Sequence, residues 1–290
     1  MPLFGSWPQD FIVNVASVPQ RSPFRYPGGK TWLVPHIRQW LSSLKTRPAE
    51  FIEPFVGGGI VSLTVAFERL TDRVTMVELD DQVAAVWRTI ISGDGEWLAS
   101  RIATFNLTIN SAKSVLALTA STIYEKAFQT ILRNRINRGG IMAPGAGIIK
   151  TGENGKGVQS RWYPQTLKKR ILNIIDIRDR ITFIEGDGIE VLRRNARRSD
   201  AVFFIDPPYT AAGKKAGSRL YTCSELDHEE LFKVTSRIKG DFLMTYDDAE
   251  GVRDLARRNG FDMETVAMKS THHAKMTELL IGRNLDWVRR

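Results

Sequence analysis

The chain has 290 residues, of which 42% are hydrophobic, enough for a large core in one or two domains. No apolar run approaches the ~18 residues that a membrane-spanning helix needs, and Met1–Gln20 lacks the basic start of a signal peptide, so we expect a cytoplasmic protein. The single cysteine, Cys223, excludes an internal disulfide and a cysteine-based zinc site, and no bound metal is expected. The net charge of +9 favours an anionic partner.

The first informative segment is a short aromatic and glycine-rich stretch before an expected helix. It reads Phe24-Arg25-Tyr26-Pro27-Gly28-Gly29-Lys30. Taken alone, it is typical of an exposed turn with a solvated lysine. The aromatic ring and the lysine indicate a function only when they are considered together with the segments that follow.

Residues 51–67 have the pattern of a strand, a glycine turn and a helix. The turn is Gly57-Gly58-Gly59, where the missing side chains let the backbone approach a ligand closely. This order is typical of the first unit of a nucleotide-binding α/β sheet. The spacing is not G-x-G-x-x-G and no phosphate-binding lysine follows, so a pyrophosphate ligand is not indicated. A tight structural turn is the alternative interpretation.

A second short strand, residues 74–79, ends in acids about twenty residues after the glycines. An acid at this place can accept hydrogen bonds from the hydroxyls of a ribose. Glu78 is the first choice because it comes directly after the apolar run, and Asp80 is the second. Solvated loop acids are the alternative.

Residues 86–178 differ in character from both flanks. Residues 87–131 and 167–177 have helical patterns, and residues 139–157 hold seven glycines, which predicts a loop. From Lys126 to Arg170 there are ten Lys or Arg and one acid, Glu153; ten minus one equals the net charge of the chain. This concentration predicts a surface that binds a polyanion, and a basic face kept for solubility is the alternative.

Strands and helices then alternate to the end of the chain. Strands are expected at 181–184, 200–206, 241–246, 261–268 and 277–281, with helices at 225–239 and 249–259. Such alternation predicts an α/β fold with a mostly parallel sheet covered by helices on both faces. The last two strands are expected to form an antiparallel hairpin at the edge.

The apolar strand at 201–205 is followed by a candidate binding site, Asp206-Pro207-Pro208-Tyr209. The Asp206 carboxylate and the Pro207 carbonyl can both accept hydrogen bonds from one amino group, and the prolines hold the backbone in place. Tyr209 offers a flat ring on which a base can stack. Together these residues predict a receptor for the exocyclic amine of a planar heterocycle. An Asp-Pro-Pro turn without function is the alternative.

The order of these segments resembles that of the Dam-like (D12 class) DNA adenine N6-methyltransferases. The order is Tyr-Pro-Gly-Gly-Lys, Phe-x-Glu-Pro-Phe-x-Gly-Gly-Gly, the strand-end acid and Asp-Pro-Pro-Tyr. The resemblance covers roughly Pro23 to Asn284. It implies a Rossmann-like catalytic domain formed by residues 20–85 and 179–290. It also implies a mainly helical target-recognition insertion at 86–178, after an N-terminal extension at 1–19.

The resemblance further implies S-adenosylmethionine as the methyl donor and a flipped-out adenine in double-stranded DNA as the acceptor. The implied catalytic residues are Asp206, Pro207, Tyr209 and Lys30. The implied cofactor-binding residues are Tyr26, Lys30, Glu53, Phe55, Gly57, Gly58, Gly59, Glu78, Asp187 and Asp206. The implied DNA-binding residues are Arg133, Arg135, Arg138, Lys168 and Lys169.

Two departures from the family pattern matter. Where the family often has a cofactor-stacking Phe after the strand-end Asp, this chain has Gly188, so another side chain must cover the cofactor's adenine or the affinity is lower. The family's Phe-Asn-Val in the recognition loop is here Ile141-Met142-Ala143, so GATC specificity does not carry over.

Other activities stay open. The amine receptor does not distinguish adenine N6 from cytosine N4, and the acceptor could be RNA instead of DNA. A catalytically silent DNA-binding relative is the alternative of another class. A restriction-modification role, with a cognate nuclease acting separately, is compatible with the resemblance.

Overall fold

The computed structural model describes residues 15–26, 28–143, 145–208, 226–269 and 275–289. Tyr209 and most of the predicted N-terminal extension lie outside these ranges. Within them, no helix is both long and apolar enough to cross a membrane.

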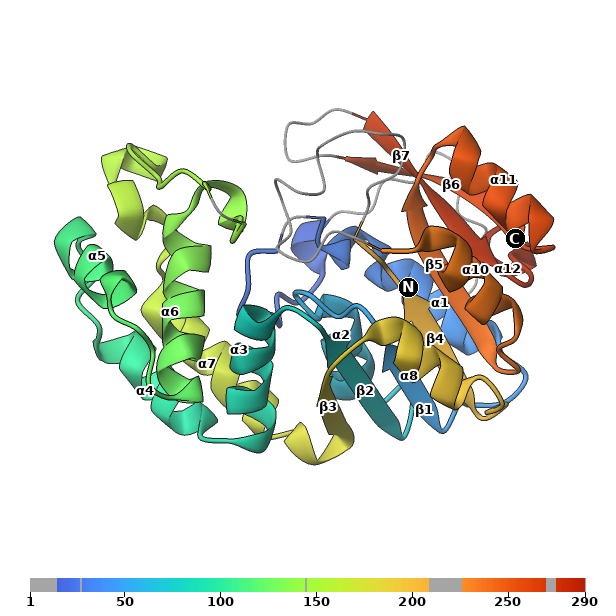
Figure 1. Ribbon diagram of the computed structural model, residues 1–290, viewed down its shortest axis with the longest axis horizontal. Coiled ribbons are helices and arrows are strands. Elements are labelled where there is room, and N and C mark those ends of the chain that lie inside the picture. The colour runs from blue at the N-terminus through green and yellow to red at the C-terminus, as the bar shows by residue number, and fades with distance from the viewer. Residues whose placement is uncertain (1–14, 27, 144, 209–225, 270–274, 290) are drawn as a thin grey trace.

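A seven-stranded sheet forms the centre of the molecule (Figure 1). Its strands are β1 (Glu50–Glu53), β2 (Arg73–Glu78), β3 (Ile181–Glu185), β4 (Ala201–Ile205), β5 (Asp241–Asp247), β6 (Asp262–Lys269) and β7 (Lys275–Gly282). Their order is β3-β2-β1-β4-β5-β7-β6, and the first five are parallel. The predicted α/β class is therefore confirmed. The predicted hairpin of β6 and β7 is also confirmed, with β7 antiparallel to both β5 and β6.

Helices cover both faces of the sheet because the central strands are apolar on both sides, as buried parallel strands are. Phe51 and Phe204 face one core, whereas Ile52 and Phe203 face the other. The first core is covered by α1 (Val34–Ser43), α2 (Ile60–Phe67) and α3 (Asp81–Ser92). The second is covered by α8 (Gly188–Asn195), α10 (His228–Ser236) and α11 (Glu250–Arg258). A short helix, α12 (Asp286–Arg289), ends the described chain.

Four more helices lie beyond the β3 edge of the sheet, on the left of Figure 1. They are α4 (Gly95–Thr104), α5 (Ile109–Ala117), α6 (Ile123–Ile136) and α7 (Pro164–Ile175). Between α6 and α7 the chain forms short 3₁₀ turns, such as Arg138–Gly140 and Gly157–Arg161, as the glycine content predicted. The expected boundary at residue 86 falls inside α3, which packs on both β3 and α6.

Candidate active site

A cavity of about 730 Å³ lies where β1, β2 and β4 end. The sheet order reverses between β1 and β4, and open α/β sheets bind ligands at the carboxyl ends of the strands at such a point. Most of the predicted site residues line this cavity: Tyr26, Lys30, Glu53, Phe55, Gly57, Gly58, Gly59, Glu78, Asp187, Asp206 and Pro207. The fold thus brings together residues that are more than 180 positions apart in the chain.

The glycine turn is shaped by the ring of Tyr26. A Cβ atom on Gly57 would lie 2.6 Å from that ring, and one on Gly58 would lie 2.7 Å from the Tyr26 Cβ. Gly57 also has a φ of +46°, which favours glycine. The indole Nε1 of Trp87, on α3, donates a hydrogen bond of 2.9 Å to the Gly57 carbonyl. The glycines therefore serve close packing within the protein as well as any approach to a ligand.

Glu78 occupies the end of β2 and is only 9% exposed. Its Oε1 accepts hydrogen bonds from the backbone N–H groups of Leu79 and Asp80, and its Oε2 accepts one from Gly57, each at 2.9 Å. A carboxylate oxygen can accept about two hydrogen bonds. The backbone therefore fills Oε1 and leaves one acceptor position on Oε2, which suits one ribose hydroxyl. Burial raises the pKa of Glu78 to about 7.

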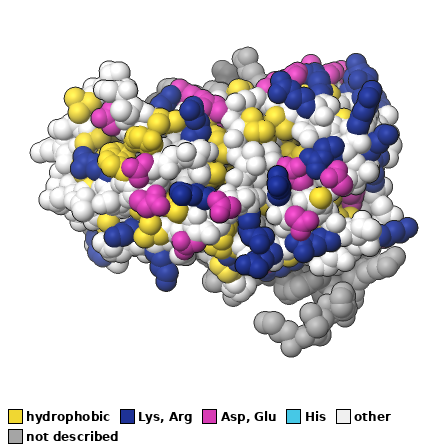
Figure 2. Space-filling model, turned by 90° about the horizontal axis from the view of Figure 1, so that it is seen from below, with side chains coloured by type: hydrophobic (Ala, Val, Ile, Leu, Met, Phe, Trp, Pro, Cys, Tyr) yellow, Lys and Arg dark blue, Asp and Glu magenta, His cyan; other side chains and the backbone are white. Residues whose placement is uncertain are grey.

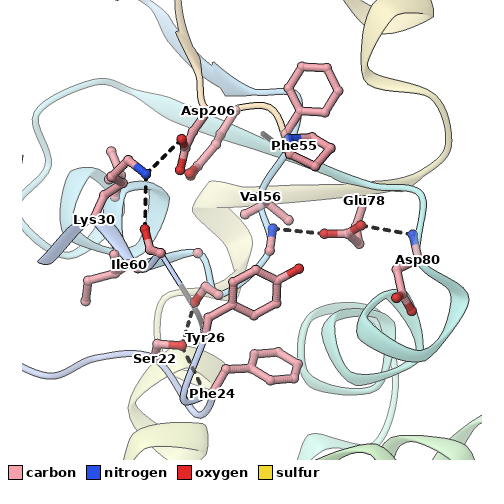
Figure 3. Close-up of a pocket in the computed structure, with 18 of the residues that line it drawn as sticks. Ser22, Phe24, Tyr26, Lys30, Phe55, Val56, Ile60, Glu78, Asp80 and Asp206 are labelled. Carbon is pink, nitrogen blue, oxygen red and sulfur yellow. Dashed lines mark hydrogen bonds and ion pairs between the residues drawn. The ribbon is translucent and has the colours of Figure 1, made fainter. Parts of the chain in front are cut away.

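Figure 3 shows Glu78 and Asp80 on one side of the Tyr26 ring, and Lys30 and Asp206 on the other. Asp80 has a different structural role from Glu78. Its side chain accepts from the backbone N–H groups of Gln82 and Val83 and so caps α3. Of the two acids, Glu78 thus has its carboxylate at the glycine turn, in line with the first choice from sequence.

The Phe55 ring lies beside Gly188, the position at which the family often has a phenylalanine. A Cβ atom on Gly188 would collide with the Pro54 carbonyl oxygen and would lie 2.9 Å from the Phe55 ring. Position 188 therefore has no room for a side chain, and Phe55 occupies the neighbouring space. Asp187, the residue before Gly188, is exposed and lines the cavity. Its side chain also caps α8 by accepting a 2.8 Å hydrogen bond from the N–H of Ile189.

Asp206 lies just after β4 and contacts Thr245 and Lys30. Its Oδ1 accepts a 2.7 Å hydrogen bond from the Thr245 hydroxyl on β5 and lies 2.9 Å from the Lys30 ammonium. Lys30 is only 3% exposed, and its Nζ also lies 3.7 Å from Glu278 Oε2 on β7. These contacts fix the orientation of the Asp206 carboxylate, whose side chain remains 20% exposed and lines the cavity. Burial raises the pKa of Glu278 to about 7.

Glu53 lies at the end of β1 and is fully enclosed. Its Oε2 accepts a 3.0 Å hydrogen bond from the backbone N–H of Ser62 in the first turn of α2. A carboxylate is favoured at a helix N-terminus. Burial nevertheless raises the pKa of Glu53 to about 8, because the charged form loses its hydration; Asp206 raises this pKa further, and Lys30 lowers it.

This pKa predicts a pH-dependent effect of Glu53→Gln on stability. A free glutamate titrates near 4.5 and the folded one near 8, so the folded state binds the proton more tightly. The wild type thus loses free energy of unfolding as the pH rises from 4.5 to 8, by up to about 1.4 kcal/mol per pH unit. Glutamine stays neutral and avoids this loss.

The measurement is urea denaturation of the wild type and Glu53→Gln at pH 5, 6.5 and 8. We expect the variant to gain stability relative to the wild type at each step. The control is Glu96→Gln, an exposed acid on α4, which should follow the wild type. Parallel curves for Glu53→Gln and the wild type would show that Glu53 is ionised in the folded protein at pH 5.

The predicted DNA-binding residues have different environments. Arg135 is buried at 3% exposure and donates a hydrogen bond from Nη2 to the Pro23 carbonyl. Arg133 is half-buried and donates to Gln82 at 2.7 Å, whereas Arg138 and Lys169 are exposed. Lys168 is half-buried on α7. On the face shown in Figure 2, Lys and Arg side chains mix with Asp and Glu and do not form one continuous patch.

Sequence reasoning missed several residues that line the cavity or support its walls. Thr245 and Glu278 support Asp206 and Lys30 from β5 and β7, and only the register of these strands brings them there. Asn134 on α6 also has an unexpected function, because its amide pairs with both the N–H and the carbonyl of Arg25. Arg25, Arg161, Tyr163 and Arg170 line the opposite wall. Their positive charge was visible in the sequence, but their meeting at one cavity was not.

Comparison with known proteins bears on this cavity. The D12 class N6 adenine-specific DNA methyltransferase family matches residues 26–113, from Tyr26 through the glycine turn and Glu78. No curated protein matches the chain.

Similar solved structures include three methyltransferases. The rRNA methyltransferase aviRa from Streptomyces viridochromogenes is 10% identical, with a TM-score of 0.40 and 97% of each chain covered. A Pyrococcus horikoshii protein described as an RNA methyltransferase is 11% identical, with a TM-score of 0.43 and coverage of 92% of this chain and 94% of that one. Precorrin-6y C5,15-methyltransferase from Geobacter metallireducens is 12% identical, with a TM-score of 0.36 and coverage of 85% and 84%.

At such identities and TM-scores, none of these structures bears on the substrate. Methyltransferases of this fold generally use S-adenosylmethionine. The family match confirms the resemblance seen in the sequence: residues 26–113 of the chain match the D12 class N6 adenine-specific DNA methyltransferase family.

Proposed function

We propose that the protein transfers a methyl group from S-adenosylmethionine to N6 of an adenine flipped out of double-stranded DNA. The observation that carries the proposal is the position of Asp206 and Pro207. They lie at the end of β4, on the wall of the cavity that also holds Glu78 and the glycine turn. An amine acceptor site and a nucleoside-binding site thus share one cavity, as a transfer between two bound molecules requires.

The residues present fit the proposed cofactor. The acceptor position on Glu78 Oε2 suits a ribose hydroxyl, and Phe55 beside Asp187 suits an adenine whose amino group donates to that carboxylate. The Lys30 ammonium lies 2.9 Å from the Asp206 carboxylate and 3.7 Å from Glu278, so its positive charge is compensated near the reacting centre. This compensation reduces repulsion of a cation, and S-adenosylmethionine, when bound, supplies a methyl group on a positively charged sulfur.

The protein's own part in the reaction is to position and polarise the amine. The Asp206 carboxylate and the Pro207 carbonyl accept hydrogen bonds from the two N6 protons. This draws the nitrogen lone pair out of conjugation with the ring and aims it at the methyl group. With the cofactor bound, the N–C bond would form as the sulfur–methyl bond breaks and S-adenosylhomocysteine leaves. Positive charge would then develop on N6, where the fixed Asp206 carboxylate stabilises it until one N6 proton is lost to that carboxylate or to water. Lys30 and Thr245 orient that carboxylate.

Expression in a methylation-deficient bacterium, followed by sequencing of the genome for modified bases, tests the proposal. We expect N6-methyladenine at one short sequence. N4-methylcytosine would assign the same chemistry to cytosine, and methylation confined to RNA would change the substrate class. Cofactor binding without methyl transfer to any nucleic acid would support a catalytically silent relative.

Arg138 is the strongest candidate for reading a base, because it is exposed directly before the glycine-rich loop at 139–157, whereas Arg135 is buried. We expect Arg138→Ala to relax the site preference by ~1–3 kcal/mol against the preferred sequence only. Lys169→Ala, a matched charge removal on α7, should weaken binding to all DNA alike and lower the salt slope by ~1. Competition binding with cognate and altered duplexes measures both. If alanine at Arg133, Arg135 and Arg138 together changes neither quantity, the basic segment is a solubility feature.

A further inference from the structure

Four arginines line the wall of the cavity that faces the helices α6 and α7. They are Arg25, Arg135, Arg161 and Arg170. Arg161 has an acid partner, Glu153. Within the described part of the chain, the other three form no ion pair. The sheet side of the same cavity carries the acids described above, so the cavity has one acidic wall and one basic wall.

Two guanidinium N–H groups in this wall are buried and unsatisfied among the described residues: Arg25 Nη1 and Arg135 Nε. The Arg135 side chain is almost fully enclosed, and its other hydrogen bonds go to the carbonyls of Pro23 and Arg161. Arg170 Nη1 donates to the Ser22 carbonyl at 2.9 Å. A buried cationic group without a counter-charge is costly, so the arrangement favours an anion that accepts from these groups.

The electrostatics agree with this geometry. Burial, and then the charges of Arg170 and Arg25, lower the pKa of Arg135 to about 9. Burial and then the charge of Arg161 lower the pKa of Arg25, whereas the nearby charge of Glu153 raises it. The charges of neighbouring arginines thus disfavour the charged forms of Arg135 and Arg25 in a partly desolvated place. An anion bound among them offsets that effect.

We propose that this basic wall is a phosphate subsite that binds a phosphodiester of the nucleic-acid strand beside the flipped nucleotide. The inference rests on the proposed function. A polynucleotide is favoured over the single carboxylate of the cofactor because four arginines exceed what one carboxylate can use. Tyr163 supports the choice, since its side chain lines the same wall, is 50% exposed and offers a ring on which a neighbouring base can stack.

The test compares Arg25→Gln with Arg73→Gln. Arg73 is exposed at the start of β2, at the opposite end of the strand from the cavity, so it controls for the loss of one charge. A fluorescent duplex that carries the methylated site is titrated at several salt concentrations. We expect Arg25→Gln to weaken binding about tenfold at 0.1 M salt and to reduce the slope of log K against log salt by about 0.9. Arg73→Gln should match the wild type.

A second measurement identifies the anion. The affinity for S-adenosylhomocysteine, measured by calorimetry, should change less than twofold in Arg25→Gln. A large loss there with an unchanged salt slope would assign the arginines to the cofactor's carboxylate and overturn the proposal. If Arg25→Gln does not fold, Arg161→Gln on the same wall takes its place.

The two proposals fail in different ways. A wild-type protein that transfers no methyl group to DNA contradicts the proposed function. A wild-type protein that methylates DNA, with an unaltered salt slope in both Arg25→Gln and Arg161→Gln, contradicts the phosphate subsite alone.

Discussion

Asp206→Ala is expected to abolish methyl transfer while S-adenosylhomocysteine still binds. The substitution removes the acceptor that holds the amine and the negative charge that stabilises the transition state. The loss of one such group from a preorganised site typically slows the reaction about 100- to 1,000-fold. Single-turnover methylation of the cognate duplex with a radiolabelled methyl donor measures the effect. More than a few per cent of the wild-type rate would refute the role given to Asp206.

The structure supplies a graded control for this result. Thr245→Val keeps the shape of the side chain but removes the hydroxyl that donates to Asp206 Oδ1. We expect a partial loss of rate, because the Lys30 contact still orients the carboxylate. Asp206→Ala also removes the carboxylate that lies 2.9 Å from the buried Lys30 ammonium, so the thermal stability of this variant is measured alongside. Equal rates for Thr245→Val and Asp206→Ala would mean that the hydroxyl, and not the carboxylate, is decisive.

Glu78→Ala is expected to weaken cofactor binding with little effect on DNA binding. One ribose hydroxyl loses a charge-assisted hydrogen bond of about 1.5–3 kcal/mol, which is roughly a 10- to 150-fold loss of affinity. The glycine turn also loses the acceptor for the Gly57 N–H, so the observed loss should lie toward the upper end. Calorimetric titration with S-adenosylhomocysteine gives the affinity, and fluorescence anisotropy with a duplex gives the DNA binding.

Asp80→Ala is the matched control, since it removes a carboxylate two residues away. Its side chain caps α3, so we expect the free energy of unfolding to fall by about 1 kcal/mol. The affinity for S-adenosylhomocysteine should stay near that of the wild type. An unchanged affinity in Glu78→Ala, together with a reduced affinity in Asp80→Ala, would transfer the ribose contact to Asp80.

The sheet and its ligand edge could be predicted because their signals are local. The apolar run 201–205 and the glycine turn each identify an element within a few residues. Glu78 could be placed correctly at the end of β2 because a carboxyl strand end follows directly from the strand pattern. Parallel strands then bring such ends to one edge without further information.

Contacts between distant segments could not be predicted in this way. The sequence predicted Arg135 to be a surface cation that binds DNA. Instead it is buried and donates hydrogen bonds to the carbonyls of Pro23 and Arg161. This burial results from the packing of α6 against the loop around Pro23. Likewise, Gly188 looked like the loss of a stacking ring. It is a consequence of the path of Pro54 and Phe55, which leaves no space for a side chain at position 188.

The pairing between Asn134 and Arg25 has a consequence for modularity. The buried Asn134 amide on α6 binds both backbone groups of Arg25, the residue next to Tyr26, and it also holds the Gly140 carbonyl. The helices beyond the sheet edge are therefore joined by hydrogen bonds to the loop that packs against the glycine turn. They are not an independent cassette: a chimera that exchanges α4–α7 for those of another enzyme must carry residues 22–26 with them, or the new helix will have no partner for that loop.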